Sequence, residues 1–226
     1  MPDPPAPQRN LLDEWELSRD EVNEILTHNP SARGNLFGYV AEYKLRRIWL
    51  QHSSIRNLER PREHRSRHED STEKGDFRFE YQGQTLRLEV KSLDTPSVRA
   101  VHATSSELAD SVTESTERGL RFEGTFQCNA SDTREVILPN DERVTTNCLV
   151  VGEFDVLAVN CFEFGRRWRF AFAANDDLPR STWRRYSPEQ QKYLLKSSMR
   201  IAWPLLAPFD DAFFRVLDSI VSKRRQ

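Results

Sequence analysis

The sequence predicts a mixed α/β fold in which a mixed central sheet is flanked by helices. Three observations predict it. Two runs of alternating polar and apolar residues lie on either side of Gly83, in the segment "GDFRFEYQGQTLRLEVKSL". Two apolar runs in "EFDVLAVNCFEFGRRWRFAFAA" are typical of buried strands. Segments with helical spacing or helix-capping residues come before and after these strands.

Length and charge limit the class of protein. The chain has 226 residues and no internal linker rich in Pro, Gly or Ser, which predicts a single domain over 1–226. A net charge of −2 excludes binding of nucleic acid by bulk charge, so such binding needs a local basic surface. No apolar run approaches a membrane span, and the opening "MPDPPAPQRN" lacks the apolar region of a secretory signal. We therefore expect a cytoplasmic protein without a membrane partner.

Two helices are predicted before the alternating runs. Ser18 and Glu21 have the spacing of a capping box at the start of "SRDEVNEILTH". From about residue 35, "NLFGYVAEYKLRRIWL" places apolar residues at helical spacing: Leu36, Val40, Leu45 and Ile48 or Trp49. A charged loop containing Pro61 follows.

The alternating runs predict a β-hairpin. Phe77, Phe79 and Tyr81 share one parity in the first arm, and Leu86, Leu88 and Val90 share one in the second. The two apolar rows coincide on one face only if the loop has an even number of residues. A loop at 82–83 places Asp76 opposite Glu89, whereas a loop at 83–84 places Asp76 opposite Lys91. Either register brings all three charged residues together on the other face.

The rest of the chain alternates strands and helices. A helix is predicted at 105–119, a strand at about 120–130 and a hairpin at about 134–151. Two buried strands follow, joined at Gly165 and Arg166. Ser187, Pro188 and Gln190 begin a further helix with a second capping box, and a terminal amphipathic helix ends in cations. We expect 176–226 to be a helical elaboration of a core at about 31–175.

The charged face of the hairpin has two interpretations from the residues alone. It is either a solvated face with cross-strand ion pairs or the beginning of a catalytic site. Lysine is scarce in this chain, because only six of the 33 cationic residues are lysines. A lysine two places after Glu89 is therefore less easily explained as a random surface residue.

These residues resemble the PD-(D/E)xK nuclease superfamily, which has the restriction-endonuclease-like fold. The resemblance lies in Asp76 at the start of one strand, in "EVK" at Glu89 to Lys91 of the next, and in an acidic helix upstream. Gly75 stands where the eponymous proline lies, a position at which the family commonly accepts other residues. In order of elements the resemblance covers roughly 31–175.

The resemblance implies a role for each residue. Asp76 and Glu89 would bind Mg²⁺, or Mn²⁺ in its place, because hard cations prefer carboxylate oxygens. Lys91 would orient the attacking water and stabilise charge in the transition state. Glu42 matches an additional acid that many members carry, although it could equally be a helix-surface acid paired with Arg46. Gln127 is either a polar group that reaches the site or an amide satisfied within the sheet. Asp155 is either a further acid in the site or a turn acid at the start of a strand.

The resemblance implies a magnesium-dependent endodeoxyribonuclease, similar to type II restriction or defence nucleases. Basic segments suit DNA as partner: Arg62 and Arg65 lie in "RNLERPREHRSRH", and Trp183, Arg184 and Arg185 lie in "PRSTWRRYS". An arginine-rich composition bias would give the same pattern. Double-strand cleavage needs two sites, which suggests a homodimer. The alternative is a non-catalytic nucleic-acid-binding or assembly module with the same fold.

Overall fold

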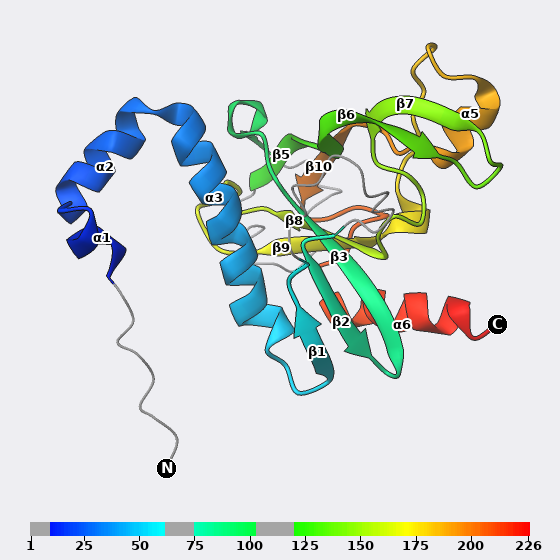
Figure 1. Cartoon of the computed structure of the whole chain (residues 1–226), viewed down its shortest axis with the longest axis horizontal. Helices are drawn as coiled ribbons and strands as arrows, with labels where there is room; N and C mark the ends of the chain where they lie inside the picture. Colours follow the sequence, from blue (N-terminus) through cyan, green and yellow to red (C-terminus); the bar gives the residue numbers. More distant parts are fainter. Residues whose placement is uncertain (1–9, 62–74, 103–119) are drawn as a thin grey trace. The chain divides into compact units, whose positions relative to one another are not determined.

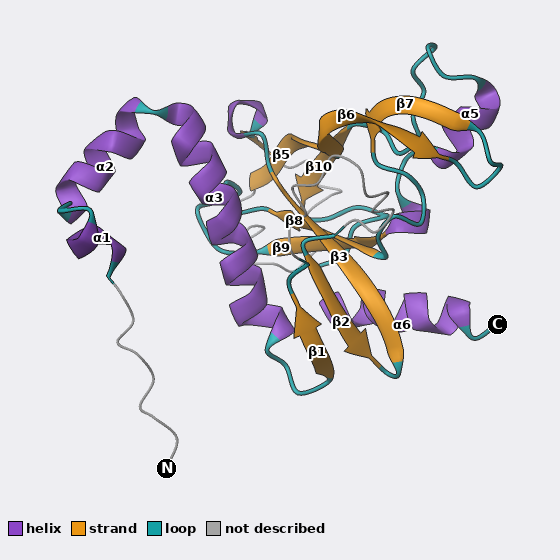
Figure 2. Cartoon of the chain, viewed as in Figure 1, coloured by secondary structure: helices purple, strands orange, loops and turns teal. Residues whose placement is uncertain are grey.

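The computed structural model describes residues 10–61, 75–102 and 120–226, which form a mixed α/β chain (Figures 1 and 2). Its contacts group the chain into two compact units, Met1–Val40 and Ala41–Gln226, where we expected one domain. The predicted helix at 105–119 and the arginines Arg62 and Arg65 lie outside the described residues. In the described part of the chain, no helix combines the length and the apolar character needed to cross a membrane.

The smaller unit consists of helices. Its first helix, α1 (Leu11–Glu14), is capped by the side chain of Asn10. The second, α2 (Arg19–His28), has the predicted capping box, in which the Ser18 hydroxyl accepts from the Glu21 N–H and the Glu21 carboxylate accepts from the Ser18 N–H. Helix α3 (Pro30–Leu45) begins here, and its last residues belong to the larger unit. Leu36 of the predicted apolar stripe is 44% exposed, so the stripe was wrong at this position.

A five-stranded mixed sheet forms the centre of the larger unit, as predicted. Its strands lie in the order β1 (Ile55–Glu59), β2 (Phe77–Tyr81), β3 (Gln84–Ser92), β8 (Val156–Asn160) and β9 (Phe170–Ala174). Strands β3 and β8 are parallel, and the other neighbours are antiparallel. The strand order in this sheet therefore joins the hairpin directly to the two buried strands.

The predicted hairpin forms with the loop at 82–83. Phe77 pairs with Leu88 and Phe79 pairs with Leu86, a register that places Asp76 opposite Glu89. Gln82 and Gly83 both have positive φ, at 48° and 77°, as a two-residue turn that follows the strand twist requires. The longer arm, β3, continues to Ser92 and so carries Glu89 and Lys91 beyond the end of β2 (Figure 1).

One face of this sheet is covered by helical residues. The apolar row of the hairpin packs with Leu45 and Leu50, from the end of α3 and the π-helical turn Arg46–Leu50 that continues it. Helix α6 (Phe213–Arg224) covers the same face with Phe213, Leu217 and other apolar residues. This core holds the hairpin in place, and the charged residues Glu89 and Lys91 lie on the opposite face of the sheet.

A second sheet covers the opposite face. It has the order β10 (Ser198–Trp203), β5 (Leu120–Gln127) and β4 (Arg99–His102). Phe126, Met199 and Ile201 from this sheet pack with Leu157 and Val159 of β8. The expected helical elaboration at 176–226 includes helices α5 and α6 but also β10, a strand that pairs with β5.

The second predicted hairpin also forms. Strands β6 (Asn129–Ile137) and β7 (Arg143–Cys148) pair with each other and lie near α5 (Pro188–Tyr193) (Figure 2). Their apolar residues pack on Tyr186 and Leu194, which flank α5. Helix α5 has the predicted cap at Ser187 but ends at Tyr193, earlier than expected. The cysteines Cys128, Cys148 and Cys161 are buried and free.

Candidate active site

Asp76 is fixed across the end of the hairpin. Its N–H donates to the carbonyl of Leu88 at 2.8 Å, and its Oδ2 accepts from the N–H of Val90 at 2.7 Å. These two bonds bracket Glu89 on the neighbouring strand. The position of the carboxylate is thus set by the strand register and not by a flexible loop.

Glu89 and Lys91 lie on the same face of β3, because alternate residues of a strand point to the same side. The Lys91 Nζ lies 2.7 Å from the Glu89 Oε1. The Glu89 side chain is only 11% exposed and the Lys91 side chain only 21%, so the pair is shielded from water. This shielding separates the pair from ordinary surface ion pairs, which contribute little.

Glu42 also belongs to the site, although not with the partner considered from the sequence. Its carboxylate is 13% exposed and forms an ion pair with Arg60, which follows β1. Arg60 itself is 56% exposed. Glu42 is close enough to raise the pKa of Asp76, so the two carboxylates repel each other.

The electrostatics of Asp76 reflect this crowding of acids. Burial, together with the negative charges of Glu89 and Glu42, raises the pKa of Asp76 to about 7. The N–H of Val90 and the ammonium group of Lys91 act in the opposite direction, but they do not cancel the effect. The site therefore has an excess of negative charge that a bound cation would reduce.

Lys91 retains its proton. Burial alone would lower its pKa, but Glu89 and Asp76 outweigh burial, and the pKa lies above its ordinary value. Cys128, a buried neighbour from the segment after β5, behaves differently, because burial raises the pKa of its thiol to about 12. Lys91 is therefore suited to act as a cation, and Cys128 is not suited to act as a thiolate nucleophile.

The donor set fits a hard divalent cation at two carboxylates. Among the described residues, one oxygen each of Asp76 and Glu89 has no hydrogen-bond or ion-pair partner, and Asp76 lies beside the negative charges of Glu89 and Glu42. Magnesium often uses only one or two protein carboxylates and keeps several waters. Within residues 10–61, 75–102 and 120–226 there is no group of three His, Cys, Asp or Glu side chains placed to hold one ion.

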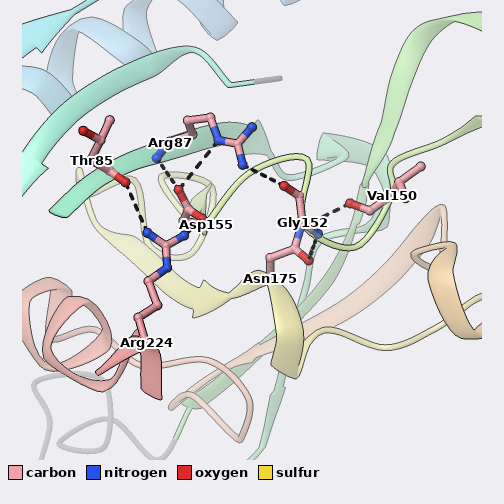
Figure 3. A network of polar contacts seen from close by, with 7 residues as sticks. All are labelled: Thr85, Arg87, Val150, Gly152, Asp155, Asn175 and Arg224. Carbon is pink, nitrogen blue, oxygen red and sulfur yellow. Dashed lines mark hydrogen bonds and ion pairs between the residues drawn. The ribbon is translucent and has the colours of Figure 1, made fainter. Parts of the chain in front are cut away.

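Asp155 has a structural role, as the strand-start alternative predicted, and its partners are extensive. Figure 3 shows Arg87 and Arg224 converging on its carboxylate. Oδ2 accepts from the Arg87 N–H at 2.6 Å, and Oδ1 forms an ion pair with Arg224 near the end of α6. The neighbouring Asn175 binds the loop through Gly152 and Val150. This network fastens α6 and the β8 loop to β3.

Gln127 is exposed on β5, where it pairs with Ser198, so it belongs to the second sheet. The buried residue that this strand region brings to the site is Cys128. The sequence did not indicate Cys128 as part of the site, and it placed Arg60 in a basic, phosphate-contacting segment and not in an ion pair with Glu42. The shared parity of Phe122, Phe126 and Cys128 could have indicated that Cys128 is buried, but no local pattern paired Arg60 with Glu42.

The segment around Trp183 presents aromatic and cationic groups together. Trp183 is 55% exposed, and the guanidinium of Arg185 lies over its ring at 5.5 Å from the centroid. Arg184 is exposed beside it. In contrast, Arg180 is used internally, since it donates to the carbonyls of Leu178 and Asp176.

Comparison of the chain with protein-family models, curated proteins and solved structures gives no match.

Proposed function

We propose that this protein is a metal-dependent endonuclease that hydrolyses phosphodiester bonds in DNA, similar to the PD-(D/E)xK family that its sequence resembles. The observation that carries the proposal is the convergence of Asp76, Glu89 and Lys91 on one shielded face of the β2–β3 hairpin. Glu42 adds a third acid to the same electrostatic environment. Structural surface pairs do not need this concentration of partly buried like charges.

In this proposal Asp76 and Glu89 hold Mg²⁺, with Mn²⁺ as a substitute. The ion would lower the pKa of a bound water and neutralise charge on the phosphate under attack. The Asp76–Val90 hydrogen bond keeps one carboxylate oxygen oriented along the strand end, so the other oxygen is presented in a fixed direction. Release of the proton that Asp76 holds near neutral pH would accompany cation binding.

Lys91 serves as a fixed positive charge. Since its pKa is raised, it remains protonated at neutral pH and does not act as a general base in the metal-free protein. It is suited to hold the attacking water by donating a hydrogen bond to its oxygen, and to stabilise the developing negative charge on the phosphate. Glu89 fixes the position of its ammonium group.

DNA is the proposed partner. Trp183, Arg184 and Arg185 would contact its backbone, since arginine and exposed aromatic groups suit phosphates and bases. Arg62 and Arg65 are further proposed contacts. A homodimer would supply the second site that double-strand cleavage needs.

A second candidate is a non-catalytic nucleic-acid-binding or assembly module. It is favoured by the engagement of Glu89 with Lys91 and by the lack, in the described part of the chain, of a three-residue metal cluster. Such a module would keep the charged face as a structural ion-pair network.

Metal titration separates the two candidates. We expect millimolar Mg²⁺ or Mn²⁺ to raise the Tm of the wild-type protein, because an ion that binds only the folded state stabilises it. The Asp76→Ala variant should show no such rise, and Asp211→Asn, at an exposed position, should respond like the wild type. A flat wild-type response would favour the binding module.

A further inference from the structure

A groove of about 570 Å³ lies on the second sheet and has no part in the proposed nuclease site. Its ionisable lining consists of Arg99, Arg121, Glu123, Lys196 and Arg200. The volume is within the usual range of small-molecule sites.

The groove lies on the outer face of this sheet. In β5, Phe126 points into the core and is fully buried, so Thr125 and Glu123 point outward. The register then places Arg200 of β10 beside Thr125, and Arg99 of β4 beside Glu123. Cys128, the neighbour of Lys91, is buried on the inner side of this sheet. The core therefore separates the groove from the candidate active site.

The charge of the groove is strongly positive, with four cations and one carboxylate. Glu123 forms ion pairs with two of these cations, because Arg99 lies 3.0 Å and Arg121 lies 3.5 Å from its carboxylate oxygens. Lys196 and Arg200 are exposed and have no ion pair with any described residue. Two cations thus remain available to an anionic ligand.

One wall of the groove is apolar. It is formed by the 206–209 segment, in which Leu206 is 62% exposed and Phe209 packs against Phe126 with ring centroids 6.0 Å apart. The turn is held by the Phe209 N–H, which donates to the Leu206 carbonyl at 3.0 Å. A fixed apolar wall beside uncompensated cations suits a ligand with a charged end and a flat apolar end.

We propose that this groove binds a nucleotide, with its phosphate at Arg200 and Lys196 and its base against the 206–209 segment. Guanidinium groups match phosphate oxygens bidentately, and a lysine ammonium group adds a point charge. The nucleotide is either a free mononucleotide or one residue of a nucleic-acid strand. The proposal does not depend on the nuclease function, because none of the proposed catalytic residues lines the groove.

The test is fluorescence anisotropy of the full-length protein with two probes, labelled ADP and a labelled single-stranded oligonucleotide. We expect Arg200→Glu and Lys196→Glu each to weaken binding at least tenfold, with an unchanged Tm because both positions are exposed. Arg33→Glu makes the same charge change at an exposed position in the smaller unit and should not weaken binding. All measurements are made in EDTA, so that metal binding and cleavage at the proposed nuclease site do not contribute, which separates this proposal from the nuclease.

The two probes distinguish a free mononucleotide from one residue of a nucleic-acid strand. Charge-sensitive binding of labelled ADP supports a free mononucleotide, and charge-sensitive binding of the oligonucleotide alone supports a strand. Inorganic phosphate should compete in either case. The proposal is overturned if the wild type binds neither probe, or if Arg33→Glu weakens binding as much as Arg200→Glu does.

Discussion

The Nζ atom of Lys91 lies 2.7 Å from the Oε1 atom of Glu89, on a strand face where both side chains are mostly shielded from water. The pairing keeps the lysine protonated and fixes its ammonium group beside a proposed metal ligand. Removing the lysine should therefore affect chemistry and metal binding in different ways.

We expect Lys91→Met to reduce DNA cleavage by about 10²–10³-fold, the range seen when a group that stabilises transition-state charge is lost. Metal affinity should stay the same or increase, because Glu89 no longer shares its charge with an ammonium group. Cleavage rates and calorimetric Mn²⁺ titration measure the two effects. Lys192→Met, which removes an exposed pair with Glu189, is the control. Equal loss of cleavage in both variants would argue against a specific role for Lys91.

The raised pKa of Asp76 predicts how stability depends on pH in the metal-free protein. The folded pKa is about 7 and the unfolded value is near 3.8, so the folded state binds more protons between these values. The contribution of this proton to the free energy of unfolding is therefore largest below about pH 4 and is lost as the pH rises through the folded pKa of about 7. Above pH 7 the charged Asp76 remains beside Glu89 and Glu42, and the Val90 N–H and the Lys91 ammonium group offset their repulsion only in part.

Asp76→Asn should therefore have a higher Tm than the wild type at pH 8 in EDTA, and the difference should shrink at pH 5. Differential scanning calorimetry at the two pH values measures this. Asp211→Asn removes an exposed carboxylate, and its Tm should equal that of the wild type at both pH values. A lower Tm for Asp76→Asn at pH 8 would show that Asp76 stabilises the fold as an anion.

Two ion pairs fasten α6, and they should contribute very differently. Arg224 pairs with Asp155, whose side chain is 7% exposed, whereas Lys223 pairs with Asp177, whose side chain is 46% exposed. Asp155→Ala leaves the N–H of Arg87 and the partly exposed guanidinium of Arg224 without their partner, so we expect a loss of about 1–3 kcal/mol in the free energy of unfolding. Asp177→Ala should cost less than about 1 kcal/mol. Urea denaturation measures both, and equal effects would contradict the structural role given to Asp155.

The geometry of the hairpin is testable through its loop. One glycine inserted after Gly83 makes the loop odd, so one arm must shift or bulge, and Asp76 is displaced from Glu89. Two inserted glycines restore the parity at a loop-closure cost of roughly under 1 kcal/mol. We expect the metal-induced rise in Tm to vanish with one glycine and to persist with two. The same response in both variants would show that the register does not build the site.

The hairpin was predictable because its signals are local. Alternation fixed the strands, and a two-residue loop with a glycine limited the register to two choices. The structure selects the register that places Asp76 opposite Glu89. Parity then places Lys91 on the same face as Glu89 in any register.

Other elements were not predictable because their signals are weak or non-local. In β1, Ile55 and Leu58 do not alternate, since Asn57 has a positive φ and the pairing is irregular between Arg56 and Glu59. Strand β10 follows the short helix α5 so closely that its alternation was read as more helix. The partner of Glu42 is Arg60, from the segment after β1, rather than Arg46 on its own helix. That pair depends on the missed strand.

Cleavage of supercoiled plasmid DNA tests the central claim most directly. The wild-type protein should nick or linearise the plasmid in millimolar Mg²⁺ or Mn²⁺ and stop when EDTA is added. Asp76→Asn, Glu89→Gln and Lys91→Met should each lose activity while keeping a cooperative thermal transition, and Asp211→Asn should cleave as the wild type does. Cleavage that persists in EDTA, or in a folded Asp76→Asn or Glu89→Gln variant, would contradict the assignment of these residues to a metal-dependent nuclease site.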